Sequence, residues 1–206
     1  MGDKRKVAAL RLYHRDSRRL PRQEAEHDHH PGAALSDVEM IMTDDRRFAA
    51  DAMLGKLAKW LRVMGIDAVY DPDIADAQLV QCAEREGRVM LTRDRRLIRR
   101  RGSVQRLFIE SDYYQEQVRQ VVQAFNLAGR IQLFTRCIRC NAPLRTTAKQ
   151  VVVGRVPSYV YATQMAFKHC AACDRLYWGG THRDNMLRQL QAMLGDMLPM
   201  SFGTPH

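Results

Sequence analysis

The sequence Val89-Met90-Leu91-Thr92-Arg93-Asp94 is the clearest indication of the fold of this chain. A short, continuously apolar run after Gly87 is typical of a strand that is buried on both faces of a sheet. Apolar residues at helical spacing precede it over residues 76–86, and a short arginine-rich helix is predicted after it over residues 95–101. Asp94 therefore stands at the turn where a buried strand gives way to a helix.

The same strand–helix unit occurs four times between residues 46 and 127. The predicted strands cover residues 47–50, 66–70, 89–91 and 104–109. The predicted helices cover residues 53–64, 76–86, 95–101 and 113–127. This alternation predicts the α/β class, with a parallel sheet and helices on both of its faces.

An aspartate stands at or just beyond the end of each predicted strand. These aspartates are Asp51, Asp71, Asp94 and Asp112. The carboxyl ends of parallel strands meet at one edge of a sheet, and ligands bind there. Crowded carboxylates repel one another unless a cation lies between them, and Mg²⁺ or Mn²⁺ prefers oxygen ligands. We expect Asp51, Asp76 and Asp94 to hold this metal and Asp112 or Asp73 to complete the set, so that water and a phosphodiester are activated there.

Two other interpretations of these aspartates remain open. An aspartate after a strand is also a common N-cap of a helix, and Asp76 and Asp112 fit that role. A phosphate-accepting receiver domain also gathers acids at strand ends, but it requires a fifth strand that ends in a lysine. Here the chain continues after residue 127 directly into a cysteine-rich region.

Basic residues outnumber acidic ones, 33 against 23, and the formal net charge of +10 favours a polyanionic partner such as nucleic acid. Many of the positive charges crowd around Asp94: Arg93, Arg95, Arg96, Arg99, Arg100 and Arg101. Arginine binds phosphate through paired hydrogen bonds, so this cluster is a candidate RNA-binding surface. Lys59 and Arg62, expected on the exposed face of the first helix, would extend it. The alternative is an ordinary solvated helix face.

Four of the five cysteines form two Cys-x-x-Cys pairs. The pairs are Cys137 with Cys140 and Cys170 with Cys173. Each pair presents two thiolates from one turn, and two such turns supply the tetrahedral sulfur set that zinc prefers. Four cysteines close the coordination shell, so the predicted zinc is structural. Asn141 and Asp174, which follow the pairs, tolerate the left-handed conformation that is often required after such a turn.

The pattern divides the chain into three regions. They are a disordered basic and histidine-rich tail over residues 1–42, an α/β domain over residues 43–129, and a zinc ribbon with a C-terminal helix over residues 130–198. Within the ribbon, residues 151–153 and 156–161 are predicted strands of a small antiparallel sheet, because Val and Tyr favour strands. The last helix, over residues 184–194, is expected to pack back on the α/β domain.

The sequence shows no run of 18 apolar residues, and its N-terminus lacks the apolar stretch of a secretion signal. Paired cysteines in such a chain indicate metal rather than disulfides, so we expect a reducing, cytoplasmic setting and no membrane partner. The fifth cysteine, Cys82, falls on the apolar spacing of a predicted helix. We interpret it as a core residue.

Four motifs in this chain are Asp51-Ala-Met-Leu-Gly-Lys-Leu-Ala-Lys-Trp-Leu-Arg62, Leu91-Thr-Arg-Asp94, Cys137-Ile-Arg-Cys140-Asn141, and Cys170-Ala-Ala-Cys173 followed by Tyr177-Trp178-Gly179 and His182. In order and spacing they resemble the Mut-seven C-terminal RNase domain family over residues 46–190. The resemblance implies a PIN-like nuclease domain over residues 43–129, fused to a zinc ribbon. It also implies that Asp51, Asp76 and Asp94, with Asp112 as a fourth, match the PIN acids.

We therefore expect a metal-dependent ribonuclease that acts on single-stranded RNA, with a structural zinc ribbon that aids RNA binding. PIN-like domains often form dimers, which leaves a homodimer open. The alternative is a non-catalytic RNA-binding or ribosome-associated protein with the same fold. A nucleotide-binding or signalling α/β domain is disfavoured, because residues 51–56 contain a single glycine where a phosphate-binding loop requires several.

Overall fold

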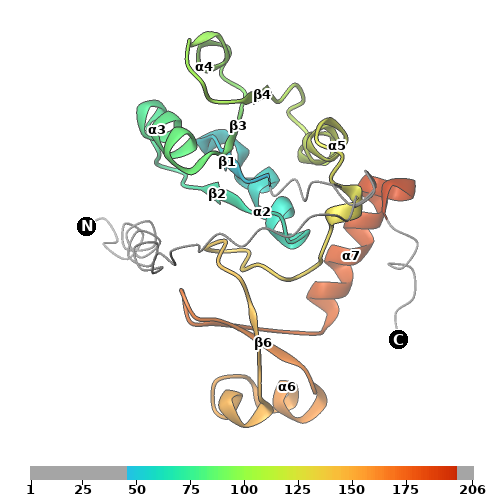
Figure 1. The fold of residues 1–206 in the computed structure, drawn as a ribbon. Coiled ribbons are helices and arrows are strands. Elements are labelled where there is room, and N and C mark those ends of the chain that lie inside the picture. The colour runs from blue at the N-terminus through green and yellow to red at the C-terminus, as the bar shows by residue number, and fades with distance from the viewer. Residues whose placement is uncertain (1–45, 199–206) are drawn as a thin grey trace, which may run out of the picture. The chain divides into compact units, whose positions relative to one another are not determined.

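The computed structural model describes residues 46–198 (Figure 1). All described residues belong to one compact unit. The tail predicted over residues 1–42 lies outside the described residues.

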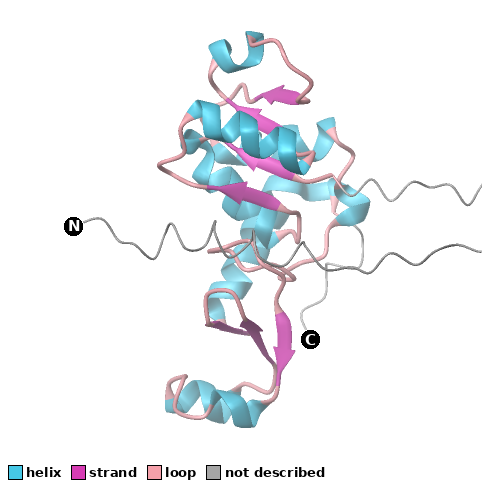
Figure 2. Ribbon diagram, turned by 60° about the vertical axis from the view of Figure 1, so that its left-hand side comes forward, coloured by secondary structure: helices cyan, strands magenta, loops and turns pink. Residues whose placement is uncertain are grey.

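Four parallel strands form one sheet in the order β2-β1-β3-β4, which confirms the predicted α/β class (Figure 2). The strands are β1 (Phe48–Ala50), β2 (Ala68–Tyr70), β3 (Val89–Thr92) and β4 (Arg106–Phe108). The helices of this part are α2 (Gly55–Val63), α3 (Asp76–Glu86), α4 (Arg95–Arg99) and α5 (Tyr114–Ala124), with 3-10 turns η1 (Ala52–Leu54) before α2 and η2 (Ala128–Arg130) after α5. Ala50 pairs with Tyr70 on one side and with Leu91 on the other, so the carboxyl ends of these strands lie together.

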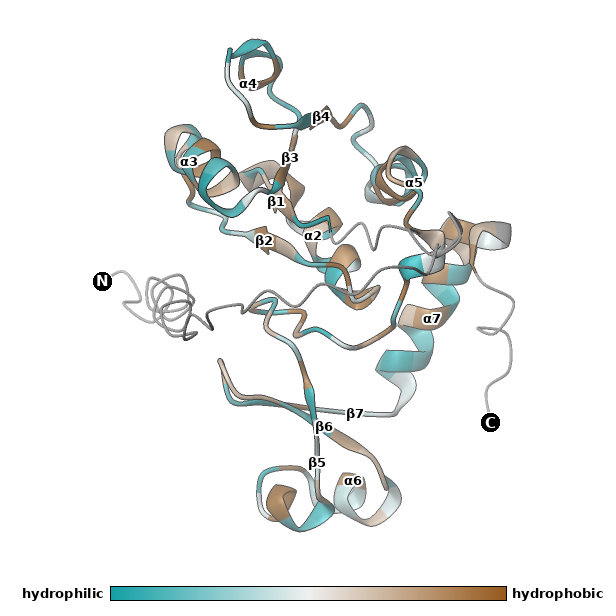
Figure 3. Ribbon diagram, in the orientation of Figure 1, coloured by the Kyte–Doolittle hydropathy of each residue, from teal (hydrophilic) through white to brown (hydrophobic). Residues whose placement is uncertain are grey.

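The central strands β1 and β3 are buried on both faces of the sheet. Successive side chains of a strand point to opposite sides, so each of these strands contributes to two cores. Phe48 and Leu91 lie in the larger core with residues of α2 and α5, whereas Ala49 and Met90 lie in a smaller core with residues of α3 and α4. The helices match this arrangement, since α3 and α5 carry both hydrophobic and hydrophilic segments (Figure 3). Double burial explains why the strands read as continuous apolar runs.

A second, antiparallel sheet follows α5, in the order β5-β6-β7. Its strands are β5 (Arg145–Thr147), β6 (Phe167–Cys170) and β7 (Arg175–Trp178). The chain then returns through α7 (Thr181–Leu194), and Met186, Leu190 and Met193 lie in the larger core of the first sheet. This confirms the expected final helix, which begins at Thr181 rather than at residue 184. The 3-10 turn η4 (Gly195–Met197) ends the described chain.

The strands predicted over residues 151–153 and 156–161 are wrong. These residues lie in the 3-10 turn η3 (Lys149–Val152) and in the helix α6 (Ser158–Thr163) and their connection. Pro157, whose fixed φ suits the start of a helix, stands directly before α6. Val152 and Val160 are buried together with Phe167 in a separate small core. Packing against β6 therefore outweighs the strand propensity of the valines.

A buried polar network joins the cysteine loop to the first sheet. Asp67, directly before β2, is 8% exposed and accepts hydrogen bonds from Arg88 at 2.5 Å and from Asn141 at 2.7 Å. Arg136 lies 3.3 Å from the other carboxylate oxygen of Asp67. The Asn141 side-chain oxygen in turn accepts the backbone N–H of Ala68 at 3.1 Å. The loop is thus attached where β2 begins, at the amino-terminal ends of the parallel strands. The predicted acids lie at the opposite, carboxyl-terminal ends.

Arg62 belongs to this junction and does not extend the predicted basic surface. The residue is 4% exposed, and its guanidinium donates to the Ala68 carbonyl at 2.8 Å. It also donates to the carbonyls of Ile138 at 3.2 Å and Arg139 at 2.9 Å. The expectation that Arg62 lies on the exposed face of its helix is wrong, because α2 turns this side chain toward the cysteine loop. A guanidinium held in this way is not available to RNA.

Candidate active site and metal centre

Two of the predicted acids are connected through Thr92 at the carboxyl edge of the first sheet. Asp51, directly after β1, is 7% exposed, and its Oδ2 accepts a hydrogen bond from the Thr92 hydroxyl at 2.6 Å. The Thr92 hydroxyl oxygen accepts the backbone N–H of Asp94 at 2.9 Å. The parallel pairing of β1 with β3 places these strand ends side by side. Thr92 therefore fixes the orientation of the Asp51 carboxylate and links the two acid-bearing turns.

Tyr70, at the end of β2, lies near the same acids. Burial raises the pKa of Tyr70, and the negative charges of three carboxylates raise it further. These carboxylates are Asp71, Asp73 and Asp51. The acids at the ends of β1 and β2 thus share one electrostatic neighbourhood around the tyrosine hydroxyl.

No hydrogen bond or ion pair joins Asp76 or Asp112 directly to these acids within residues 46–198. Asp76 is the exposed first residue of α3, and Asp112 is bound by Arg93 at 2.6 Å. Asp94 is the N-cap of helix α4, because its Oδ1 accepts the backbone N–H of Arg96 at 2.6 Å. Among the described residues, the four cysteines form the group of three or more side chains whose ligand atoms lie close enough to share one metal ion. No three carboxylates in this part of the chain come as close together.

The Asp51 carboxylate nevertheless suits a hard divalent cation. It is buried, and within the described range no lysine or arginine forms an ion pair with it. A buried carboxylate without a counter-charge is costly. Mg²⁺ or Mn²⁺ would relieve this cost, because each prefers the oxygen ligands that Asp51 and Asp94 offer.

Gly55 is required by the position of Tyr70. The Tyr70 hydroxyl donates to the Ala52 carbonyl at 3.1 Å, which lays its ring against the start of α2. A Cβ atom at Gly55 would lie 2.6 Å from the Tyr70 hydroxyl oxygen and 2.8 Å from ring carbon Cζ. These distances are too short for any side chain, so Tyr70 would have to move.

We expect Gly55→Ala to lower the free energy of unfolding by about 1–3 kcal/mol, because overpacking displaces Tyr70. The matched control is Gly129→Ala, since a Cβ atom at Gly129 meets nothing within 4 Å. Denaturant unfolding of both variants measures the difference. Equal stabilities would show that Tyr70 is not held against α2.

The arginines near Asp94 divide into a structural residue and an exposed group. Arg93 donates to the carbonyls of Ile109 at 3.3 Å and Glu110 at 2.8 Å, besides its ion pair with Asp112. It thereby ties the end of β3 to the end of β4. The exposed basic residues are Arg95, Arg96, Arg99, Arg100 and Arg101, and Lys56 and Lys59 on α2. The α4 surface begins at Asp94, so its positive charges adjoin the acids.

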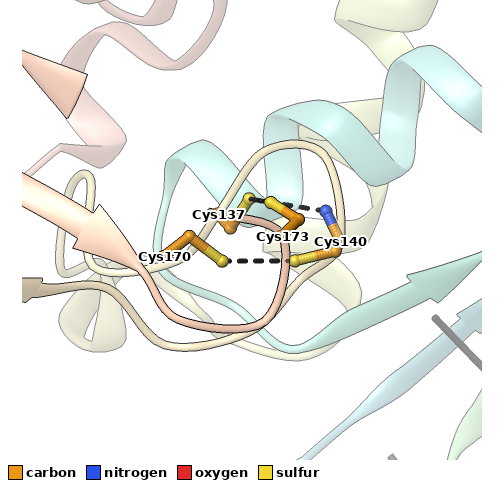
Figure 4. Close-up of side chains that lie close together, drawn as sticks. All are labelled: Cys137, Cys140, Cys170 and Cys173. Carbon is orange, nitrogen blue, oxygen red and sulfur yellow. Dashed lines mark hydrogen bonds between the residues drawn. The ribbon is translucent and has the colours of Figure 1, made fainter. Parts of the chain in front are cut away.

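The four predicted zinc ligands converge from two loops (Figure 4). Their sulfur atoms all lie within 4.8 Å of one another, with Cys137 3.5 Å from Cys173 and Cys140 3.4 Å from Cys170. A zinc tetrahedron with bonds of about 2.3 Å has edges of about 3.8 Å. The spacing of the sulfur atoms therefore fits one tetrahedral zinc ion.

Neighbouring groups favour the thiolate at Cys137, whereas the pKa values of Cys140 and Cys173 are raised by burial and by the other sulfur atoms. Hydrogen bonding from Cys140 lowers the pKa of Cys137 to about 4 against the effect of burial, and a hydrogen bond from the Tyr177 hydroxyl at 3.0 Å contributes. Asn141 and Asp174 have φ of 71° and 55°, as predicted for the residues after the two pairs. His169 contacts Asp174 at 2.8 Å, so the sulfur set closes without it.

Sequence reasoning missed the residues that hold both centres in place. Thr92 was visible in the motif around Asp94, and its fully buried hydroxyl connects the acids. Tyr70 stands directly before Asp71, but nothing in the pattern indicates that its ring covers Gly55. Asp67 and Arg88 look like surface charges in the sequence, and only the fold shows them buried and paired.

Comparison with protein families matches residues 46–190 to a family model described as the Mut7-C RNAse domain. A search of curated proteins and of solved structures finds no match to the chain. None of the described helices is long and apolar enough to span a membrane.

Proposed function

This chain belongs to the Mut7-C RNAse domain family, and from that premise we propose that it hydrolyses single-stranded RNA at the carboxyl edge of the four-stranded sheet. The observation that carries the proposal is the hydrogen-bonded connection from Asp51 through Thr92 to Asp94. It places two acids on adjacent strand ends, and one of them is a buried carboxylate without a cationic partner in the described chain.

Asp51, Asp94 and Asp76 would hold a Mg²⁺ or Mn²⁺ ion, with Asp112 or Asp73 as a further ligand. Such an ion supplies positive charge for the phosphodiester and lowers the pKa of a bound water. Thr92 occupies Oδ2 of Asp51 and so leaves Oδ1 for a ligand. The turn before α4 holds Asp94, because its Oδ1 accepts from Arg96.

The exposed residues Arg95, Arg96, Arg99, Arg100 and Lys59 would bind the RNA backbone beside the acids. Arg93 would act indirectly, because its guanidinium is already bonded to two carbonyls and to Asp112. The four cysteines would hold a structural zinc ion that keeps the ribbon folded and aids RNA binding.

Asp94→Asn tests the proposal most directly. Asparagine is also a good N-cap, so the substitution removes a charge and keeps the start of α4. With labelled single-stranded RNA and Mn²⁺, we expect cleavage to fall about 100-fold or more, and Asp51→Asn should behave alike. The matched control, Asp184→Asn, changes an exposed aspartate in the first turn of α7 and should cleave normally.

The outcomes separate the candidate functions. Equal cleavage by wild type and both active-site variants would assign the activity to a contaminant. Tight RNA binding by all proteins, without cleavage by any of them, would favour the non-catalytic RNA-binding alternative.

A further inference from the structure

A cavity of about 500 Å³ lies on the ribbon, away from the acids. It is lined by Ile138, Arg139, Arg155, Asp174, Arg175, Leu176, Tyr177 and Trp178. Half of this lining comes from β7, which is an edge strand of the small sheet, and the rest includes the cysteine loop. This volume falls within the range of ligand-binding sites.

The lining combines planar aromatic surface with unpaired positive charge. Trp178 is 38% exposed although it is a large apolar side chain. Arg139 and Arg175 are exposed, and within residues 46–198 neither side chain forms an ion pair. Arg155 is bonded to Asp174 at 2.7 Å, which offsets the negative charge at the pocket. Three arginines against one aspartate leave this lining positive.

The Tyr177 side chain gives the pocket a fixed wall. Its hydroxyl is bonded to the Cys137 sulfur, so the ring cannot swing away without disturbing the cysteine set. The backbone carbonyls of Ile138 and Arg139 are held by the buried Arg62. The pocket is therefore built on rigid parts of the molecule, although Trp178 and the arginine side chains face solvent.

We infer that this pocket binds one nucleotide of the RNA strand, with its base stacked on Trp178 and its phosphate bound by Arg139 and Arg175. Aromatic rings stack on bases of any sequence, and arginine binds phosphate through two hydrogen bonds. The inference rests on the proposed ribonuclease function, because it assigns the ribbon a part of the same substrate.

The position of the pocket determines what such binding does. The cysteine loop is attached where β2 begins, whereas the acids follow the strand ends. Strands of three or four residues span about 10–13 Å at 3.3 Å per residue. The pocket therefore holds the strand at least this far from the bond that is cut, and it selects RNA long enough to reach both places.

Tryptophan fluorescence tests this inference without cleavage. The chain has two tryptophans, and Trp60 is buried at 4% exposure, so added RNA changes the emission of Trp178. The probe is a 16-nucleotide oligouridylate without added divalent cation, and anisotropy of a labelled copy reports binding independently. We expect quenching in wild type and none in Trp178→Leu, whose affinity by anisotropy should be about tenfold weaker.

Two arginine variants test the phosphate contact. Arg139→Gln and Arg175→Gln should each reduce the slope of log affinity against log salt by about 0.7. Arg145→Gln is the matched control, because Arg145 is exposed on β5 at the other side of the same sheet and does not line the pocket. Uridine monophosphate is the second probe, and it should bind far more weakly than the oligonucleotide.

The result that overturns the inference is saturated RNA binding by anisotropy with unchanged Trp178 emission, even if the RNA is cleaved. Monophosphate binding as tight as oligonucleotide binding would also overturn it, since the pocket would then serve a free nucleotide. Quenching that depends on Trp178, Arg139 and Arg175 supports it whether or not the acids cleave RNA. The two proposals can therefore fail separately.

Discussion

Cys137→Ser is expected to lose its zinc and more than about 5 kcal/mol of stability, because binding to a structural zinc site is itself folding free energy. Cys137 contributes one of four sulfur atoms that lie within 4.8 Å of one another, and its sulfur also bonds Tyr177. A hydroxyl in its place is a poor ligand for zinc. Zinc stoichiometry by atomic emission and denaturant unfolding measure the two effects.

The matched control is Cys82→Ser, the same substitution in a buried cysteine of α3 that lies outside the sulfur set. Its contact with Glu86 is long, at 3.8 Å, so we expect full zinc content and a loss near 1 kcal/mol. Full zinc content in Cys137→Ser would contradict the four-sulfur assignment.

Asp67→Asn is expected to destabilise the protein by about 3–5 kcal/mol, the range for a broken buried ion pair. The Arg88 side chain that it neutralises is fully buried, and the substitution leaves Glu86 as its carboxylate partner in the described chain. Thermal and denaturant unfolding measure the loss, which should also affect the ribbon, because Asn141 bonds the same carboxylate.

Asp112→Asn is the matched control for burial. Its ion pair with Arg93 is 2.6 Å long, against 2.5 Å for Asp67 with Arg88, but the Asp112 side chain is 85% exposed and that of Asp67 is 9% exposed. An exposed pair contributes about 0–1 kcal/mol. Similar losses in the two variants would show that the Asp67 network does not depend on burial.

The pH dependence of stability gives a second measurement on Asp67. Burial raises the pKa of this carboxyl, but the charge and hydrogen bond of Arg88, with Arg136 and Asn141, outweigh burial and lower it. The stabilisation is therefore present above the unfolded pKa of about 4 and is lost as the pH falls through the lower folded value. Asp67→Asn should lack this component of acid unfolding, and an unchanged acid profile would contradict the assignment.

The sequence predicts the first sheet well, because its strands are short apolar runs between helices of clear periodicity. The strands β1 to β4 and the helices α2 to α5 all lie within or close to the predicted ranges. The pairing of β1 with β3 also brings Asp51 near Asp94, as the strand-end argument requires. The predictions for Asp76 and Asp112 as metal ligands stay predictions, since Asp76 begins α3, Asp112 is bonded to Arg93, and neither is bonded to Asp51 or Asp94.

The ribbon is harder to predict from local patterns. Valine-rich residues 151–153 have strand propensity, but Val152 packs with Val160 and Phe167 in a turn and helix instead. Charged residues mislead in the same way. Arg62 has the spacing of an exposed helix residue, and only the carbonyls of Ile138 and Arg139, distant in sequence, explain its burial.

The junction at Asp67 limits how this chain can be divided or recombined. A fragment cut near residue 129 would keep Asp67, Arg88 and Arg62 but lose Asn141 and the carbonyls that these side chains face. A ribbon grafted from another protein would leave the same polar groups desolvated and unmatched. The α/β domain and the ribbon therefore cannot be exchanged freely between homologues. An exchange should succeed only when the residue that bonds Asp67 is transferred together with the cysteine loop.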